Sequence, residues 1–117
     1  MRRAKLIIIF TFVATTIAAC GSSEPERFSI VESSGYESSL FRQHCAICHG
    51  PEGDGKTLDD GTVVPSLRSG EFKKVGEAAI YEQISEGGNG MTPFRTQLTE
   101  RELRLLTDLV HNKLRKN

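Results

Sequence analysis

Five consecutive residues constrain this chain more than any other feature. Cys45-Ala46-Ile47-Cys48-His49 places two thiols three positions apart and an imidazole directly after the second thiol. Two thiols at this spacing near a helix end can each bond to one vinyl group at a porphyrin edge, and the next imidazole then lies beneath the iron as its proximal ligand. The pattern therefore predicts one covalently attached haem c, with Cys45, Cys48 and His49 as cofactor-binding residues and His49 as a ligand of the iron.

Two other kinds of site use a cysteine pair at this spacing. A structural zinc ion needs four ligands, and the chain has three cysteines in all, so a second pair is missing. A thioredoxin-like redox pair follows a strand within a βαβ pattern, and the sequence before Cys45 predicts no strand. Haem attachment is thus favoured over both. A metal or thiol protein without haem is the alternative that a colourless preparation would reveal.

Met91 is the predicted second ligand of the iron. It is the one methionine after the initiator, and it follows a glycine-rich segment and precedes Pro93. Glycines let a backbone approach a porphyrin closely, proline stiffens a loop, and methionine opposite histidine raises the reduction potential of haem iron. His44 and His111 are the rival ligands, but His44 adjoins the attachment side and His111 falls on the last predicted helix. If Met91 were not a ligand, the iron would be open to small molecules, as in a gas sensor or a peroxidase-like protein.

The N-terminal residues predict export. Three basic residues within the first five are followed by an uncharged, mainly apolar run over 6–19, which is shorter than the ~20 apolar residues that span a bilayer. Ile17-Ala18-Ala19-Cys20 resembles the lipobox of bacterial lipoproteins, which implies cleavage before Cys20 and a lipid on that cysteine. We therefore expect a signal peptide over 1–19, a flexible tether over 20–34 and one domain over 35–117, facing the periplasm or the cell exterior from a membrane. An uncleaved anchor helix and a plain signal peptide are the alternatives.

Charge excludes one class of partner. The chain has 15 basic and 15 acidic residues. Loss of Arg2, Arg3 and Lys5 with the signal peptide leaves 12 against 15, a net charge of −3. Nucleic-acid binding calls for a basic patch, so this mildly acidic domain is a poor candidate for it.

Apolar spacing predicts an all-α fold. Helices are expected over 36–48, over 77–86 and from a capping box at Thr99–Glu102 onward, and no segment reads as a strand. The last helix has one apolar stripe, formed by Leu103, Leu106, Leu109, Val110 and Leu114. The glycine-rich stretch over 50–76 is expected to be mostly loop.

Over residues 36 to about 114 the chain resembles the class I cytochrome c family, in its short bacterial mono-haem form. Besides the cysteine motif, the resemblance rests on motifs in the family's order and spacing: Leu40-Phe41, Gly53-Asp54-Gly55, Pro65-x-Leu67, Ile84-x-x-Gly87, Met91 with Pro93-Phe94, and Leu98-Thr99-x-x-Glu102. Two features depart from the family, since Thr92 separates Met91 from Pro93 and the last helix has no aromatic residue in its second half.

The resemblance implies four to five helices around one covalently attached haem, and it implies roles for further residues. The first and last helices should cross, so that Phe41 meets the apolar stripe. The carbonyl of Pro65 should accept a hydrogen bond from the second ring nitrogen of His49, and Leu67 should form a wall of the haem pocket. Arg68 and Arg95 could pair with haem propionates, although solvated surface positions are expected for both.

The function implied by the family is electron transfer without catalysis of a substrate reaction. A monomeric carrier would exchange electrons with membrane-bound or periplasmic redox proteins. The alternative is a haem-containing subunit of a larger oxidoreductase.

Overall fold

The computed structural model describes residues 26–115. The predicted signal peptide, Cys20 and the start of the predicted tether lie outside this range. The described residues form four α-helices, one 3₁₀ helix, one π-helical turn and two short strands, which in chain order are α2 (Tyr36–His44), α3 (Ala46–His49), β1 (Lys56–Thr57), β2 (Val63–Val64), η1 (Gly70–Lys74), α4 (Glu77–Glu86), α5 (Glu100–Asp108) and η2 (Leu109–Lys113). None of these helices is long and apolar enough to cross a bilayer.

The first predicted helix is divided in two at Cys45. Its backbone angles there are φ −114° and ψ −35°, so φ departs from the α-helical value near −63°. The N–H of Cys45 still donates to the carbonyl of Phe41 at 2.8 Å, and that of His49 donates to the carbonyl of Cys45 at 2.9 Å. The chain therefore turns at the first cysteine while these two hydrogen bonds are kept, and α3 consists of the last four residues of the haem motif.

The last helix begins as predicted and ends differently. The side chain of Thr99 accepts from the N–H of Glu102, and the carboxylate of Glu102 accepts from the N–H of Thr99, which confirms the capping box. From Leu109 the hydrogen bonding widens, and the N–H of Leu114 donates to the carbonyl of Leu109 at 3.0 Å. This five-residue step is a π-helical turn, which the apolar spacing did not predict. It lets both leucines point into the core.

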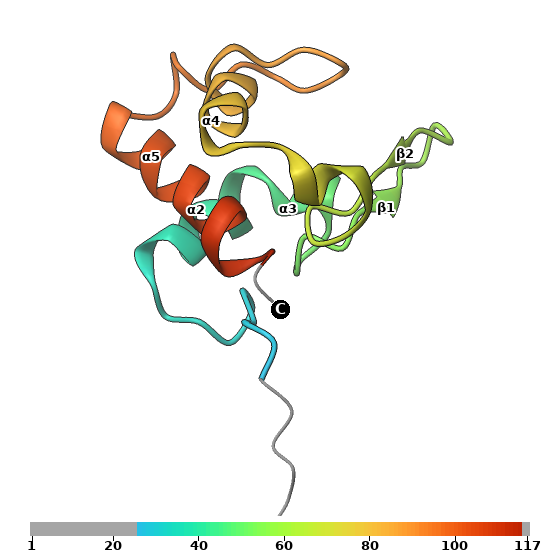
Figure 1. The fold of residues 1–117 in the computed structure, drawn as a ribbon. Helices are drawn as coiled ribbons and strands as arrows, with labels where there is room; N and C mark the ends of the chain where they lie inside the picture. Colours follow the sequence, from blue (N-terminus) through green and yellow to red (C-terminus); the bar gives the residue numbers. More distant parts are fainter. Residues whose placement is uncertain (1–25, 116–117) are drawn as a thin grey trace, which may run out of the picture.

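The core lies where α2 and α4 pack against α5, and α4 also packs against η2 (Figure 1). Phe41 is 1% exposed and belongs to the same buried cluster as the stripe of the last helix. Its ring and the side chain of Leu114 both approach the Cα of Gly53, where a Cβ would lie 3.5 Å and 3.3 Å from them. Phe41 and the stripe, including its Leu103–Val110 part, thus share one buried cluster where α2 packs against α5, as the predicted crossing of the first and last helices requires.

A small sheet corrects the all-α prediction. Strands β1 and β2 pair antiparallel, with Lys56 opposite Val64 and Thr57 opposite Val63, and their hairpin projects from the body of the molecule (Figure 1). The side chain of Val63 is 73% exposed. Two-residue strands are too short to show the alternation of apolar and polar residues that predicts a strand.

The N-terminal strap, defined here as residues 28–33, is part of the folded domain. Ile30 is fully buried. The carboxylate of Glu52 accepts hydrogen bonds from the N–H groups of Ile30 and Val31 at 2.9 Å and 3.0 Å, and from the hydroxyl of Ser29 at 2.8 Å. This segment therefore does not belong to the flexible tether predicted over 20–34.

Two arginines complete the attachment of the strap. Arg68 donates from Nη2 to the carboxylate of Glu52 at 2.9 Å and to the carbonyl of Phe28 at 3.0 Å, and Arg42 donates from Nη1 to the carbonyl of Ile30 at 2.6 Å. Arg68 is only 8% exposed, so the expectation of a solvated surface position was wrong for it. These partners lie 12 to 40 positions apart in sequence, and no local pattern indicates them.

Candidate haem site

The two cysteines of the motif lie in different environments. Cys45 is half-buried, Cys48 is exposed, and neither forms a disulfide. Burial, with a smaller contribution from the neighbouring Cys48, raises the pKa of the Cys45 thiol to about 12. A redox-active cysteine pair needs a thiol with a lowered pKa, so this environment does not suit disulfide exchange.

His49 at the end of α3 has the properties of a metal ligand. The imidazole is half-buried, and burial lowers its pKa, so the neutral ring that can ligate a metal is favoured. Its Nδ1 atom is buried without a hydrogen-bond partner. A ligating histidine nearly always hydrogen-bonds through its other ring nitrogen, so this unsatisfied atom fits a ring that becomes oriented when a metal binds.

Pro65 and Leu67 are brought to the same side of the domain as His49. The N–H of Gly55 donates to the carbonyl of His49 at 2.9 Å, and a Cβ on Gly55 would lie 2.7 Å from the carbonyl carbon of Pro65. The N–H of Leu67 donates to the carbonyl of Gly53 at 2.9 Å, and its side chain packs against the core. The hydrogen bond expected between the His49 ring and the Pro65 carbonyl is not formed in this structure, although the two segments are adjacent.

Met91 is held by a tight turn. The N–H and carbonyl of Gly88 bond to the carbonyl and N–H of Met91, both at 2.9 Å. Asn89 and Gly90 between them have φ of 52° and 84°, as a type I′ turn requires. At Gly87, with φ 71°, a Cβ would lie 2.5 Å from the carbonyl oxygen of Met91, so only glycine fits there without a backbone shift.

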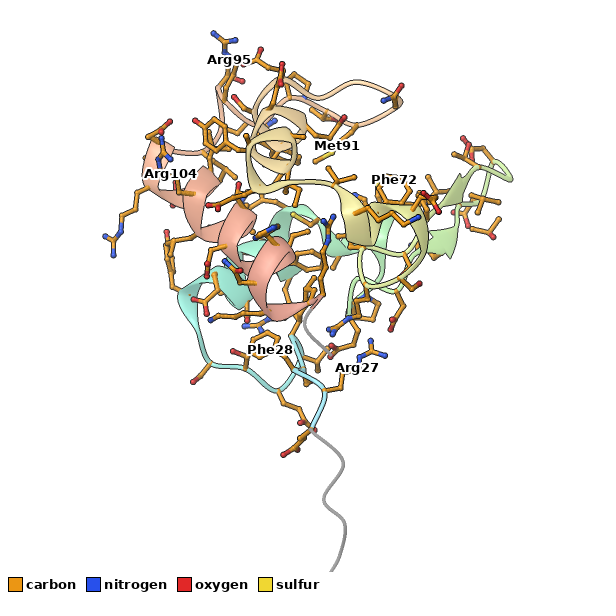
Figure 2. All side chains as sticks on the ribbon, in the orientation of Figure 1. Arg27, Phe28, Phe72, Met91, Arg95 and Arg104 are labelled. Atoms are coloured by element: carbon orange, nitrogen blue, oxygen red, sulfur yellow. The ribbon has the colours of Figure 1, made fainter. Side chains whose placement is uncertain are left out.

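The loop after the turn is fastened to the end of α4. The N–H of Phe94 donates to the carbonyl of Ile84 at 3.1 Å, and that of Arg95 donates to the carbonyl of Ser85 at 3.2 Å. The side chain of Met91 is half-buried and packs against the core, on the inner side of its loop, whereas Arg95 points outward (Figure 2). Arg95 pairs with Glu86 on the surface at 2.5 Å, as expected of a solvated residue.

Gln83 is a residue of this site that the sequence did not indicate. Its side-chain Nε2 donates to the carbonyl of Gly88 at 3.0 Å and lies 3.9 Å from the sulfur of Met91. Glutamine in a helix is ordinarily a solvated residue, and only the folded turn places it against a methionine.

The rival ligands have other surroundings. The ring of His44 packs edge-on against Phe94, with centroids 6.0 Å apart. His111 lies in η2, away in sequence from the cysteine motif, although its Nδ1 is buried without a hydrogen-bond partner like that of His49. Across residues 26–115, no three His, Cys, Asp or Glu side chains converge to hold a metal ion. A zinc site is therefore not supported in this part of the chain.

The family model described as cytochrome c oxidase, cbb3-type, subunit III matches residues 38–110. The chain belongs to the cytochrome c family. A solved structure titled KustC0563 c-type cytochrome is 34% identical, with a TM-score of 0.58 over 67% of this chain and 95% of that chain. Cytochrome c6C from Synechococcus sp. PCC 7002 is 20% identical, with a TM-score of 0.55 over 69% of this chain and 96% of its own, and shares the fold. No curated protein matches this chain.

Membership of this family establishes the cofactor of the domain. The domain is a small, mainly helical c-type cytochrome, and its cofactor is a covalently bound haem c with its iron. Two cysteines outside any disulfide, an imidazole with an unsatisfied buried nitrogen and a methionine on a fixed turn all fit this group.

Proposed function

We propose that this cytochrome is a one-electron carrier in which Cys45 and Cys48 attach the haem and His49 and Met91 ligate its iron. The observation that carries the proposal is the fixed Met91 turn. Met91 is the only methionine in the described part of the chain. Two backbone hydrogen bonds to Gly88 fix its position without help from a ligand.

The residues proposed for the site suit electron transfer. When bound, the haem supplies a couple between ferric and ferrous iron. A thioether ligand raises the reduction potential of that couple. The turn holds the Met91 backbone, and α3 holds that of His49, so neither ligand has to move far when an electron arrives. Pro65 would accept from Nδ1 of His49, and Leu67 would exclude water beside it.

The ligand assignment is tested by absorption spectra of the full-length, haem-loaded protein. The oxidised wild type should show the weak red band of methionine bound to ferric haem, and Met91→Ala should lose it. Thr92→Ala, at the exposed neighbouring position, should keep it. A wild-type spectrum without the band, combined with rapid carbon monoxide binding by the reduced form, would favour an open iron and a sensing or peroxidase-like role.

We also propose that the mature protein is held at a membrane by a lipid on Cys20. The support is the lipobox-like sequence after an apolar run too short to span a bilayer. Two or more acyl chains give stable anchoring, at about 0.8 kcal/mol per buried methylene. Mass spectrometry should find an acylated N-terminal cysteine, and Cys20→Ser should move the cytochrome to the soluble fraction. An unmodified, soluble wild-type protein would contradict the proposal.

A second candidate is a haem subunit of a larger oxidoreductase. The matched family is named for a subunit of a cytochrome c oxidase, and this name supports the subunit as a candidate beside the independent carrier. Purification in a mild detergent distinguishes the two. A monomeric cytochrome supports the independent carrier, whereas stoichiometric co-purification with integral membrane chains supports the subunit.

A further inference from the structure

Gln83 occupies the last turn of α4, where its side chain reaches the turn that carries Met91. Its Nε2 donates to the carbonyl of Gly88 at 3.0 Å, and the same nitrogen lies 3.9 Å from Sδ of Met91. The side chain is half-buried, as is that of Met91. The carbonyl is the stronger acceptor, so it fixes the rotamer of the glutamine.

A carboxamide nitrogen carries two hydrogens in fixed directions. One is used by the carbonyl of Gly88, and the second is then available to the thioether. Neutral N–H donors to sulfur make weak hydrogen bonds, but hydrogen bonds around an axial ligand are one of the means by which a protein sets the reduction potential of haem iron. A sulfur lone pair engaged by a donor gives less electron density to a metal, which favours the ferrous state.

We propose that Gln83 is the positioning residue of the Met91 ligand: it holds the Met91 turn and donates a hydrogen bond to Sδ, and thereby raises the reduction potential. This rests on the proposed ligation by Met91. The residue acts through the methionine and does not itself contact the iron.

Gln97 supplies a matched control. It is exposed, and its Nε2 donates to the carbonyl of Pro93 in the same loop at 3.4 Å. Gln97→Leu therefore removes an amide that fastens the loop without contacting the sulfur. Gln83→Leu, the same replacement, removes the amide that donates to both Gly88 and Met91.

The test is a redox titration of the full-length, haem-loaded protein, followed by the visible spectrum. In Gln83→Leu we expect the Met-to-ferric-iron band to persist but shift. At a fixed solution potential, the ratio of ferric to ferrous protein should rise about threefold, which is roughly 28 mV at 59 mV per tenfold change for one electron. In Gln97→Leu the band and the potential should match those of wild type.

Two outcomes would overturn the proposal. An unchanged band and potential in Gln83→Leu would show that no hydrogen bond to the sulfur matters. Loss of the band in Gln83→Leu alone would show that the glutamine only fastens the turn. Neither can be confused with failure of the proposed function, because in that case the wild-type protein itself would lack the band.

Discussion

Replacing Arg68 by methionine tests whether the N-terminal strap is a structural part of the domain. The guanidinium is nearly fully buried and bonds to Glu52 and to the strap carbonyl of Phe28. Methionine retains the apolar stem and removes the charge and the donors. Removing one partner of a buried ion pair costs ~3–5 kcal/mol. Because the Glu52 side chain is 24% exposed, water can hydrate the carboxylate that has lost its partner. We therefore expect the free energy of unfolding to fall by about 3 kcal/mol, at the lower end of this range.

The loss is measured by urea and thermal unfolding of the full-length, haem-loaded protein. A change of 1 kcal/mol shifts the melting temperature by ~4–8 °C in a domain of this size, so Arg68→Met should melt roughly 12–24 °C lower. Arg95→Met is the control. Its ion pair with Glu86 is short, at 2.5 Å, but the side chains are 59% and 50% exposed, so the expected loss is under about 1 kcal/mol. Equal losses in the two variants would refute the argument from burial.

Acid should weaken the attachment of the strap to Glu52. Burial opposes ionisation of Glu52, but hydrogen bonds from the N–H groups of Val31 and Ile30 and from Ser29, with the charge of Arg68, outweigh it and hold its pKa below the ordinary value. A lowered pKa stabilises the fold above the ordinary glutamate pKa, near 4.3, and this stability is lost as the pH falls through the lowered pKa. The protection factor of the Ile30 amide, which is the intrinsic hydrogen-exchange rate divided by the observed rate at the same pH, should therefore fall below pH ~4, and an unchanged protection factor would argue against it.

Three further changes probe the rest of the fold. Gly87→Ala should displace the Met91 turn and weaken the red band, because the added Cβ would lie 2.5 Å from a backbone oxygen, whereas Gly61→Ala has a similar φ and open space and should keep the band. Glu102→Gln should flatten the dependence of stability on pH between about pH 4 and pH 2. The hydrogen bond from the Tyr36 hydroxyl is the largest cause that lowers the pKa of Glu102 to about 2, and the capping-box bonds with Thr99 come next. An unchanged acid transition would contradict this. Leu106→Ala, at a side chain 1% exposed, should cost ~3–5 kcal/mol in urea unfolding, and a loss below ~1 kcal/mol would show that the site collapses around the gap.

Local signals predicted the helices well. Helix α4 spans the residues expected of it, and the capping box at Thr99 begins α5 as the sequence indicated. Both predictions rest on interactions within one or two turns of the chain, which a short window of sequence contains. For the segment before Met91 the sequence predicted only a glycine-rich loop. The tight turn found there has positive φ at three of those glycines and at Asn89.

Features formed over long distances were missed. Ile30 looked like part of a polar tether, because its burial depends on Glu52 and Arg42, 22 and 12 positions away. The β1–β2 hairpin has too few residues for an alternating pattern. The π-helical turn at Leu109 has no signal in the sequence and can be understood only from the burial of the leucines in the folded structure. The role of Gln83 depends on a loop that folds back on its own helix.

The strap also sets how far the haem domain can travel. With a lipid on Cys20 and the chain fixed to the domain from Phe28, eight residue steps separate the two, and at ~3.6 Å each they reach about 29 Å when fully stretched. The domain would then swivel next to the lipid headgroups, and its electron donor and acceptor would have to present their redox centres close to that same membrane surface. Lengthening this segment by a flexible insert should widen the set of partners that the cytochrome can reduce, whereas loosening the strap would do so without adding a residue.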